Sequence, residues 1–231
     1  VGAGAAGTPV QAVYSDSGSA INISPNAKTG NYAGTNSVVV GYENKTDSDT
    51  NNWGRIIYGA NNTAAGASTL ALGNENEARG PATTAIGVGS KALDKQSVAI
   101  GNVARAAKQG SIAIGSYVNA ETTNTGTATA PVYNTIENGV FSTAVGSQSL
   151  ATKSYATAYG YLSKAQSVSA VALGVNNKVN ENSDGSTAVG SGNTATGQYT
   201  SAFGRENTIN LAGSLAAGYK NTRSEEHTSE L

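Results

Sequence analysis

Small and large apolar residues alternate along most of the chain in short runs that end at a glycine. Runs such as TLALG, TTAIG, SVAIG, SIAIG and STAVG share one form: Ser or Thr, any residue, Ala, an apolar residue, Gly. Alternation with a period of two is typical of a β-strand, whereas glycines every few positions break a helical period of about 3.6 residues. The pattern therefore predicts an all-β protein with many strands of about five residues.

The closing glycines of these runs define a repeat of 14 residues, because eight of the eleven intervals between them have this length. They are Gly41, Gly59, Gly73, Gly87, Gly101, Gly115, Gly146, Gly160, Gly174, Gly190, Gly204 and Gly218. Ala recurs two residues before and five residues after the glycine, and Asn or Ser recurs in the turn three residues after it. Two strands with a turn after each fit a two-sided coil, so we predict a parallel β-roll, a two-sided solenoid of about twelve coils.

The alternation also predicts which face of each strand is buried. The two sheets of so short a coil lie close together, so the inward positions need small residues such as Ala99. Val98 and Ile100 on either side of it then point outward, and similar pairs recur along the chain: Leu70 and Leu72, Ile112 and Ile114, Val171 and Leu173, Val38 and Val40. An apolar stripe of this length exceeds what a soluble monomer leaves exposed, so we expect a parallel homotrimer to bury it.

Breaks in the repeat suggest a division of the chain into three parts. We predict an irregular or degenerate-coil segment at 1–35, the β-roll at 36–222 and a non-native tail at 223–231. The tail reads RSEEHTSEL and resembles the translation of a sequencing adapter. A natural polar tail is the alternative, and in either case its His is not interpreted as catalytic.

The longer intervals between closing glycines are candidate ligand-binding loops, since a rigid scaffold positions loops that tolerate change. The first contains Asn51, Asn52 and the one Trp of the chain, Trp53, and the second, which is rich in Thr, contains Pro131 and Tyr133. Trp53 and Tyr133 are candidate aromatic anchors for a partner. Covering the end of a coil is the alternative role for Trp53.

Composition and charge narrow the classes of function. Charged residues make up 13% of the chain, the formal net charge is −1, and there is no Cys. Because the net charge is close to zero, it does not indicate binding to nucleic acid or to anionic lipid. Outside the tail there is neither His nor Cys to serve as base or nucleophile, and the acids are scattered over turns. We therefore predict a protein that is not an enzyme and has no cofactor or metal site.

A period of 14 residues with runs of the SVAIG type resembles the head domain of trimeric autotransporter adhesins, the YadA-like family. The resemblance covers about residues 36–222 and implies a left-handed parallel β-roll with three chains side by side at the tip of a stalk. It implies a bacterial cell-surface location and membrane contact only through a C-terminal outer-membrane anchor. Since the chain contains no Met, we expect a fragment whose stalk and anchor lie outside this sequence.

In this family, stretches of the NSVAIGxxS type are associated with binding of extracellular matrix such as collagen. The nearest matches here are residues 96–104 and 110–118, which make Ser97 and Ser111 candidate ligand contacts. Both stretches depart from the pattern at the leading Asn and the trailing Ser. Packing within the roll is the alternative role for the two serines.

Two other functions stay open beside an adhesin head. A phage or secreted fibre segment would use the same trimeric roll. An ice-binding or mineral-binding solenoid would need a flat row of one residue type, but three residues before the closing glycine, seven of twelve residues are Val, Ile or Leu. The sequence therefore favours a cell-surface adhesin head.

Overall fold

The structure, a computed structural model, describes residues 11–13, 21–24, 37–46, 54–124, 133–135 and 139–224. These residues form strands and turns, and no helix occurs among them. A helix long and apolar enough to cross a membrane is accordingly not found in the described part of the chain. The contacts divide the chain into an N-terminal unit, Val1–Gln109, and a C-terminal unit, Gly110–Leu231.

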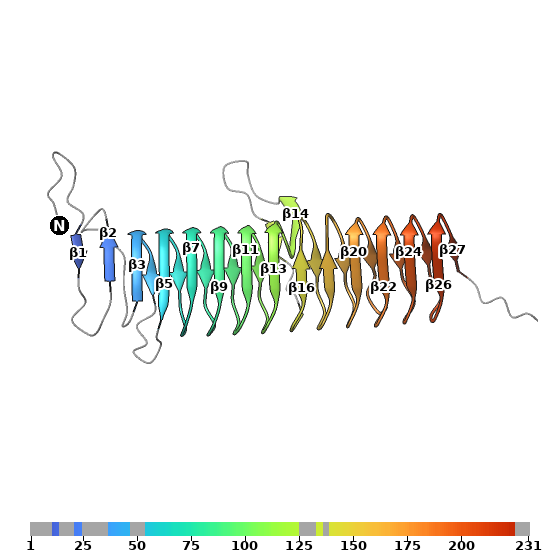
Figure 1. Ribbon diagram of the computed structural model, residues 1–231, viewed down its shortest axis with the longest axis horizontal. Coiled ribbons are helices and arrows are strands. Elements are labelled where there is room, and N and C mark those ends of the chain that lie inside the picture. The colour runs from blue at the N-terminus through green and yellow to red at the C-terminus, as the bar shows by residue number, and fades with distance from the viewer. Residues whose placement is uncertain are drawn as a thin grey trace, which may run out of the picture. The chain divides into compact units, whose positions relative to one another are not determined.

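Long and short strands alternate along the N-terminal unit and build two parallel sheets (Figure 1). The long sheet contains β3 (Ser37–Tyr42), β5 (Arg55–Ala60), β7 (Leu70–Asn74), β9 (Thr84–Val88) and β11 (Val98–Asn102). The short sheet contains β4 (Lys45–Thr46), β6 (Thr63–Ala64), β8 (Glu77–Ala78), β10 (Lys91–Ala92) and β12 (Arg105–Ala106). Neighbouring strands pair one repeat apart, with Ala99 opposite Ala85 and Ala92 opposite Ala78. One long and one short strand thus form a coil of a parallel β-solenoid.

Two further strands precede these coils in the N-terminal unit. β1 (Gln11–Val13) pairs antiparallel with β2 (Ile21–Ser24), and β2 pairs parallel with β3, which places Ile21 opposite Val38. The first strand therefore departs from the parallel pattern of the coils.

The C-terminal unit repeats the same arrangement (Figure 1). Its long sheet contains β13 (Ile112–Ser116), β16 (Thr143–Val145), β18 (Thr157–Tyr159), β20 (Val171–Val175), β22 (Thr187–Ser191), β24 (Ser201–Arg205) and β26 (Leu215–Tyr219). Its short sheet contains β17 (Leu150–Ala151), β19 (Lys164–Ala165), β21 (Lys178–Val179), β23 (Thr194–Ala195), β25 (Thr208–Ile209) and β27 (Thr222–Arg223). The predicted all-β parallel solenoid, with a coil about every 14 residues, is confirmed.

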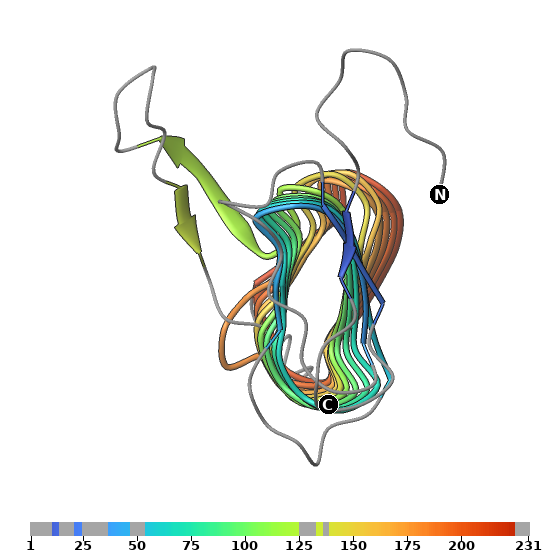
Figure 2. The same cartoon turned by 90° about the vertical axis from the view of Figure 1, so that its left-hand side faces the viewer.

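A hairpin interrupts the coils of the C-terminal unit within the long predicted insertion. β14 (Ala120–Asn124) pairs antiparallel with β15 (Tyr133–Thr135), with Asn124 opposite Tyr133. The two strands extend away from the coils of their own unit (Figure 2).

Small residues fill the space between the two sheets of each unit. Fully buried alanines occur both two residues before the closing glycine and five residues after it, as at Ala99 and Ala92. The same holds in the C-terminal unit, as at Ala188 and Ala195. The small inward residues predicted from the alternation are therefore confirmed, and the buried core is thin.

The closing glycines allow successive coils to approach closely. All twelve have a φ between +111° and +136°, a backbone conformation that side chains disfavour. A Cβ atom on Gly87 would lie only 1.9 Å from the carbonyl oxygen of Gly101 in the next coil. The repeat therefore needs glycine at this position for steric reasons.

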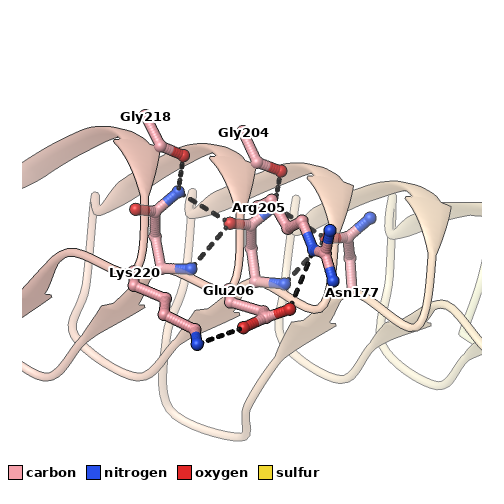
Figure 3. Close-up of polar contacts among 8 residues, drawn as sticks. Asn177, Gly204, Arg205, Glu206, Gly218 and Lys220 are labelled. Carbon is pink, nitrogen blue, oxygen red and sulfur yellow. Dashed lines mark hydrogen bonds and ion pairs between the residues drawn. The ribbon is translucent and has the colours of Figure 1, made fainter.

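A ladder of buried asparagines connects the coils at the turn after the closing glycine. In the C-terminal unit, Asn193 donates from its backbone N and from Nδ2 to Oδ1 of Asn177, both at 3.0 Å. Its Nδ2 also donates to the carbonyl oxygen of Gly204 at 2.7 Å (Figure 3). Asn207 and Asn221 each bond the preceding asparagine in the same way. The amides thereby satisfy polar groups that the turn would otherwise leave unpaired.

The N-terminal unit has an equivalent ladder, made by Asn44, Asn62 and Asn76. All three are fully or almost fully buried. Ser90 follows them, and its hydroxyl donates to the carbonyl oxygen of Gly101 at 2.8 Å. A serine therefore preserves the bond to the glycine.

Candidate binding surfaces

The outer face of each long sheet carries an apolar stripe, formed by the residues one and three positions before each closing glycine. In the N-terminal unit, Val98 and Ile100 lie opposite Thr84 and Ile86 of the neighbouring strand. These four residues are half-buried, whereas Ala99 is fully buried. The predicted outward direction of the apolar stripe is confirmed.

The outer face of each short sheet is polar and is called here the polar face. It is formed by the residues four positions after the closing glycine together with those that follow each short strand. In the N-terminal unit, the first row is Lys45, Thr63, Glu77, Lys91 and Arg105. In the C-terminal unit, the row begins at Leu150, which is apolar and buried, and continues with Lys164, Lys178, Thr194, Thr208 and Thr222. The polar face is thus richer in cations and hydroxyls than the apolar stripe.

Aromatic rings line one turn of the coils in the C-terminal unit. Phe141, Tyr155 and Tyr199 are 46%, 60% and 71% exposed. The rings of Phe141 and Tyr155 stack, with centroids 5.9 Å apart and planes at 18°. A Cβ on Gly110 would lie 2.3 Å from the ring of Phe141, and one on Gly185 would lie 2.8 Å from that of Tyr199. The rings of Phe141 and Tyr199 therefore pack against the backbone of a neighbouring coil and expose their remaining surface.

A charged cluster lies at the opposite turn, where β24 and β26 end (Figure 3). Nε of Arg205 and Nζ of Lys220 lie 2.8 Å and 3.6 Å from the carboxylate oxygens of Glu206. Both cations also lie over the ring of Tyr219, at 5.6 Å and 5.1 Å from its centroid. The hydrogen bond with Tyr219, followed by the charge of Glu206, raises the pKa of Lys220 above its ordinary value. Because these groups are exposed, their ion pairs contribute little to stability.

The candidate loop residues differ in what the structure describes of them. Asn51, Asn52, Trp53 and Pro131 lie outside the described residues. Tyr133 is the first residue of β15, whose backbone pairs with β14. The loops therefore stay candidate sites that are predicted from the sequence.

Ser97 and Ser111 both lie inside the roll rather than on a surface. Each is fully buried. The hydroxyl of Ser97 donates to the carbonyl oxygen of Asp94 at 2.6 Å, which closes the turn before β11. Their burial favours the packing role over direct contact with a ligand, because a buried hydroxyl is not accessible to a macromolecule.

Two features were missed by the sequence reasoning. The cations of the polar face were hidden because net charge averages over every face of the molecule. The recurring Asn was interpreted as a turn residue, although its period of 14 residues was a signal for a ladder between coils.

Groups of three or more His, Cys, Asp or Glu that fit a metal ion are not found among the described residues.

A family model described as the YadA head domain repeat (2 copies) matches residues 78–104, 95–117, 138–163 and 182–207. The matched segments contain closing glycines, inward alanines and outward apolar residues of both units. The chain carries YadA head repeats. No curated protein matches the chain.

Coils outside the matched segments have the same register as the YadA head repeats. In the N-terminal unit, β3, β5 and β7 pair in parallel with Gly41, Gly59 and Gly73 opposite one another. In the C-terminal unit, β24 and β26 pair with Gly204 opposite Gly218. The register of the matched segments therefore continues in coils that the family model does not match.

Proposed function

We propose that this chain is the head of a bacterial cell-surface adhesin, which assembles as a parallel homotrimer and binds extracellular matrix or other cells. The YadA head repeats and the solenoid fold support the adhesin class. The observation that carries the proposal is the apolar stripe on the outer face of the long sheets.

The apolar stripe includes large side chains that a single chain leaves open to water. Ile56 and Tyr58 are 47% and 63% exposed in the N-terminal unit, and Tyr159, Phe203 and Leu215 are 59%, 41% and 54% exposed in the C-terminal unit. Soluble monomers rarely leave continuous apolar patches of more than a few hundred Å². Identical chains around a shared axis bury the same stripe on every copy. We take the number of copies, three, from the resemblance to YadA-like heads.

Burial of the apolar stripe leaves the polar faces and the turns for recognition. Three identical copies on one head give avidity, since the second and third contacts form at a high effective concentration. The proposal contains no catalysis and no cofactor. Display on the outer membrane would depend on stalk and anchor segments outside this sequence.

The mass of the protein in solution tests the assembly. Light scattering and circular dichroism of residues 1–222 at several concentrations are expected to give a β-rich species of about three times the monomer mass. A folded monomer at every concentration would contradict the burial of the apolar stripe.

Adhesion is tested on surfaces coated with collagen or with other matrix proteins. We expect the trimer to remain bound on washing and an assembly-deficient variant to wash off, because avidity is lost with the trimer. Equal retention of both, or retention of neither on any matrix or cell type, would contradict the adhesive function.

The alternative of an ice-binding or mineral-binding solenoid has one structural feature in its favour. Thr194, Thr208 and Thr222 form a row on the polar face of the C-terminal unit. The row ends at Lys178, opposite Thr194, and a flat row of one residue type does not continue. The adhesin head is therefore the better supported function.

A further inference from the structure

The asparagine ladder does not extend through every coil of the C-terminal unit. The ladder position is the third residue after the closing glycine, and it holds Asn in each of the coils built by β20–β27, called here the laddered coils. In the coils built by β16–β19, called here the gapped coils, the position holds Ser149 and Ser163. The coil of β13 before them has Val118 there. These three residues are fully or almost fully buried, so the gap in the ladder lies in the interior.

In the laddered coils, one asparagine makes three hydrogen bonds across the interface with the following coil. Oδ1 of Asn177 accepts from the backbone N and from Nδ2 of Asn193, both at 3.0 Å. Nδ2 of Asn177 donates to the carbonyl oxygen of Gly190 at 2.7 Å. A buried amide therefore connects each of these coils to the next.

In the gapped coils, serine replaces these bonds only in part. The hydroxyl of Ser163 donates to the carbonyl oxygen of Gly174 at 2.8 Å, which is one bond across the interface. The hydroxyl of Ser149 donates to Gly146 of its own turn, at 3.0 Å. The backbone N of Ser149 lies 3.5 Å from the same oxygen, too far for a good hydrogen bond, since Val118 in the preceding coil offers no amide oxygen. The interface between the gapped coils thus lacks the amide bonds of the ladder.

The turn before each long strand shows the same difference. In the laddered coils, the hydroxyl of Ser186 donates to the carbonyl oxygen of Gly197 at 2.7 Å and accepts from the backbone N of Thr200 at 2.9 Å. At the equivalent position of the gapped coils, Ala156 has no hydroxyl, and the buried hydroxyl of Ser142 has no hydrogen-bond partner within the described part of the chain. A buried polar group without a partner destabilises the folded state.

The backbone pairing of the gapped coils is weaker as well. β16 and β18 have three residues each, whereas β20 and β22 have five. A further bond, from the backbone N of Ala151 to Oδ1 of Asn119 at 2.9 Å, joins the coil of β13 to the gapped coils and does not connect the gapped coils to each other. Shorter strands and fewer side-chain bonds therefore occur at the same interface.

We propose that the gapped coils are a site of local unfolding, which opens while the laddered coils stay folded. In a solenoid each coil is held by its neighbours, so the interfaces with the fewest bonds open first. The hairpin of β14 and β15 directly precedes β16 in the order of strands. Opening of the gapped coils therefore loosens the attachment of the hairpin, and the laddered coils remain as a fixed support. The inference does not depend on the proposed function.

Hydrogen exchange of the full chain, resolved to single amides by mass spectrometry with fragmentation, tests the proposal. Thr143 and Thr187 are a matched pair, since the backbone N of each donates to a carbonyl oxygen one coil later, of Ala156 at 2.9 Å and of Thr200 at 2.8 Å. We expect the amide of Thr143 to exchange faster than that of Thr187 by about tenfold or more. Equal rates, or slower exchange at Thr143, would overturn the proposal.

Substitutions at the ladder position test the cause of the difference. The double substitution Ser149→Asn and Ser163→Asn supplies the two missing amides and is expected to slow exchange at Thr143 by about fivefold or more. The reverse change, Asn193→Ser, removes an amide from the laddered coils and is expected to speed exchange at Thr187 by a similar factor.

The control is Ser169→Asn, which makes the same chemical change at an exposed residue of the other turn. Its φ of +54° is a conformation that asparagine tolerates, so we expect wild-type exchange. Circular dichroism checks that every variant keeps the β-rich fold. The proposal is wrong if the double variant slows exchange no more than Ser169→Asn, or if Asn193→Ser leaves Thr187 unchanged. The wild-type comparison and Asn193→Ser decide the proposal even where the double variant does not fold.

Discussion

The outer faces of the long and the short sheets differ in chemistry although the same coils build both. On the long sheet of the C-terminal unit, Val171 and Leu173 lie opposite Thr187 and Val189, whereas on the short sheet Lys178 lies opposite Thr194. Both sheets are parallel and share the same separation of coils. The difference therefore rests on the outward side chains alone. The backbone of the coil is the same for both faces. The residues at the outward positions of the long and the short strand give each face its own chemistry.

The largest effect on assembly is expected when a charge is placed on the apolar stripe, and a second variant places the same charge on the polar face of the same coil. Val189→Asp puts a carboxylate on the apolar stripe, where its burial between chains costs about 3–5 kcal/mol per copy. We expect the light-scattering mass to fall from the trimer to the monomer. Thr194→Asp, on the polar face and opposite Lys178, is the control and should leave the mass unchanged. Loss of assembly in both variants, or in neither, would remove the distinction between the faces.

The interior that both faces share is tested by Asn193→Ala. The change removes the acceptor for the backbone N and Nδ2 of Asn207 and the donor to Gly204. Buried polar groups left without a partner should lower the free energy of unfolding by about 2–4 kcal/mol. Urea denaturation measures the loss, and Thr194→Ala, one residue away on the polar face, should stay within about 0.5 kcal/mol of the wild type. Similar losses in both variants would contradict the role of the ladder.

Substitution of the stacked rings at the turn between the two faces should have a smaller effect on the free energy of unfolding. A double-mutant cycle with Phe141→Leu and Tyr155→Leu is expected to give a coupling energy of about 0.5–1.5 kcal/mol, as for other aromatic pairs. Thermal or urea unfolding of the four proteins supplies the values. Additive losses would mean that the two rings contribute independently and that the stacking at 5.9 Å carries no energy.

The smallest effect is expected from the exposed charged cluster at the other turn. Because the folded-state pKa of Lys220 is raised above 10.5, its favourable interactions are fully present below that pH. They are lost as pH rises through the raised pKa, so stability near neutral pH should not change with this group. NMR titration of the Lys220 side chain should show a lower pKa in Glu206→Gln than in the wild type. An identical titration in both proteins would exclude the contribution of Glu206.

The coils and their faces were predictable from the sequence because one steric demand recurs in every repeat. Ala99 between Val98 and Ile100 shows both the thin interior and the outward stripe, and the structure has both. The hairpin of β14 and β15 was not predictable, since the segment between its flanking coils has no period. Burial of Asn193 was missed because asparagine is usually exposed in turns, and its partners are one coil away in each direction.

The binding surfaces were harder to predict than the coils for a different reason. Ser97 belongs to a type of run that is associated with ligand binding in YadA-like heads. The serine is nevertheless buried, and its hydroxyl donates to the carbonyl oxygen of Asp94. Lys91 and Arg105 are 14 residues apart in sequence, and only the strand register brings them together. Neighbouring side chains on the surface of a solenoid therefore come from successive coils rather than from adjacent positions in the sequence.

The asparagine ladder also bears on how such a roll can change in length. Apart from a bond to Val189 of its own coil, Asn193 bonds only the coil before it and the coil after it, so the stability of the roll is close to a sum over neighbours. An in-frame gain or loss of the codons for one 14-residue interval rejoins an asparagine to an equivalent asparagine. Such a change would lengthen or shorten the roll by one whole coil and keep the bonds of the ladder.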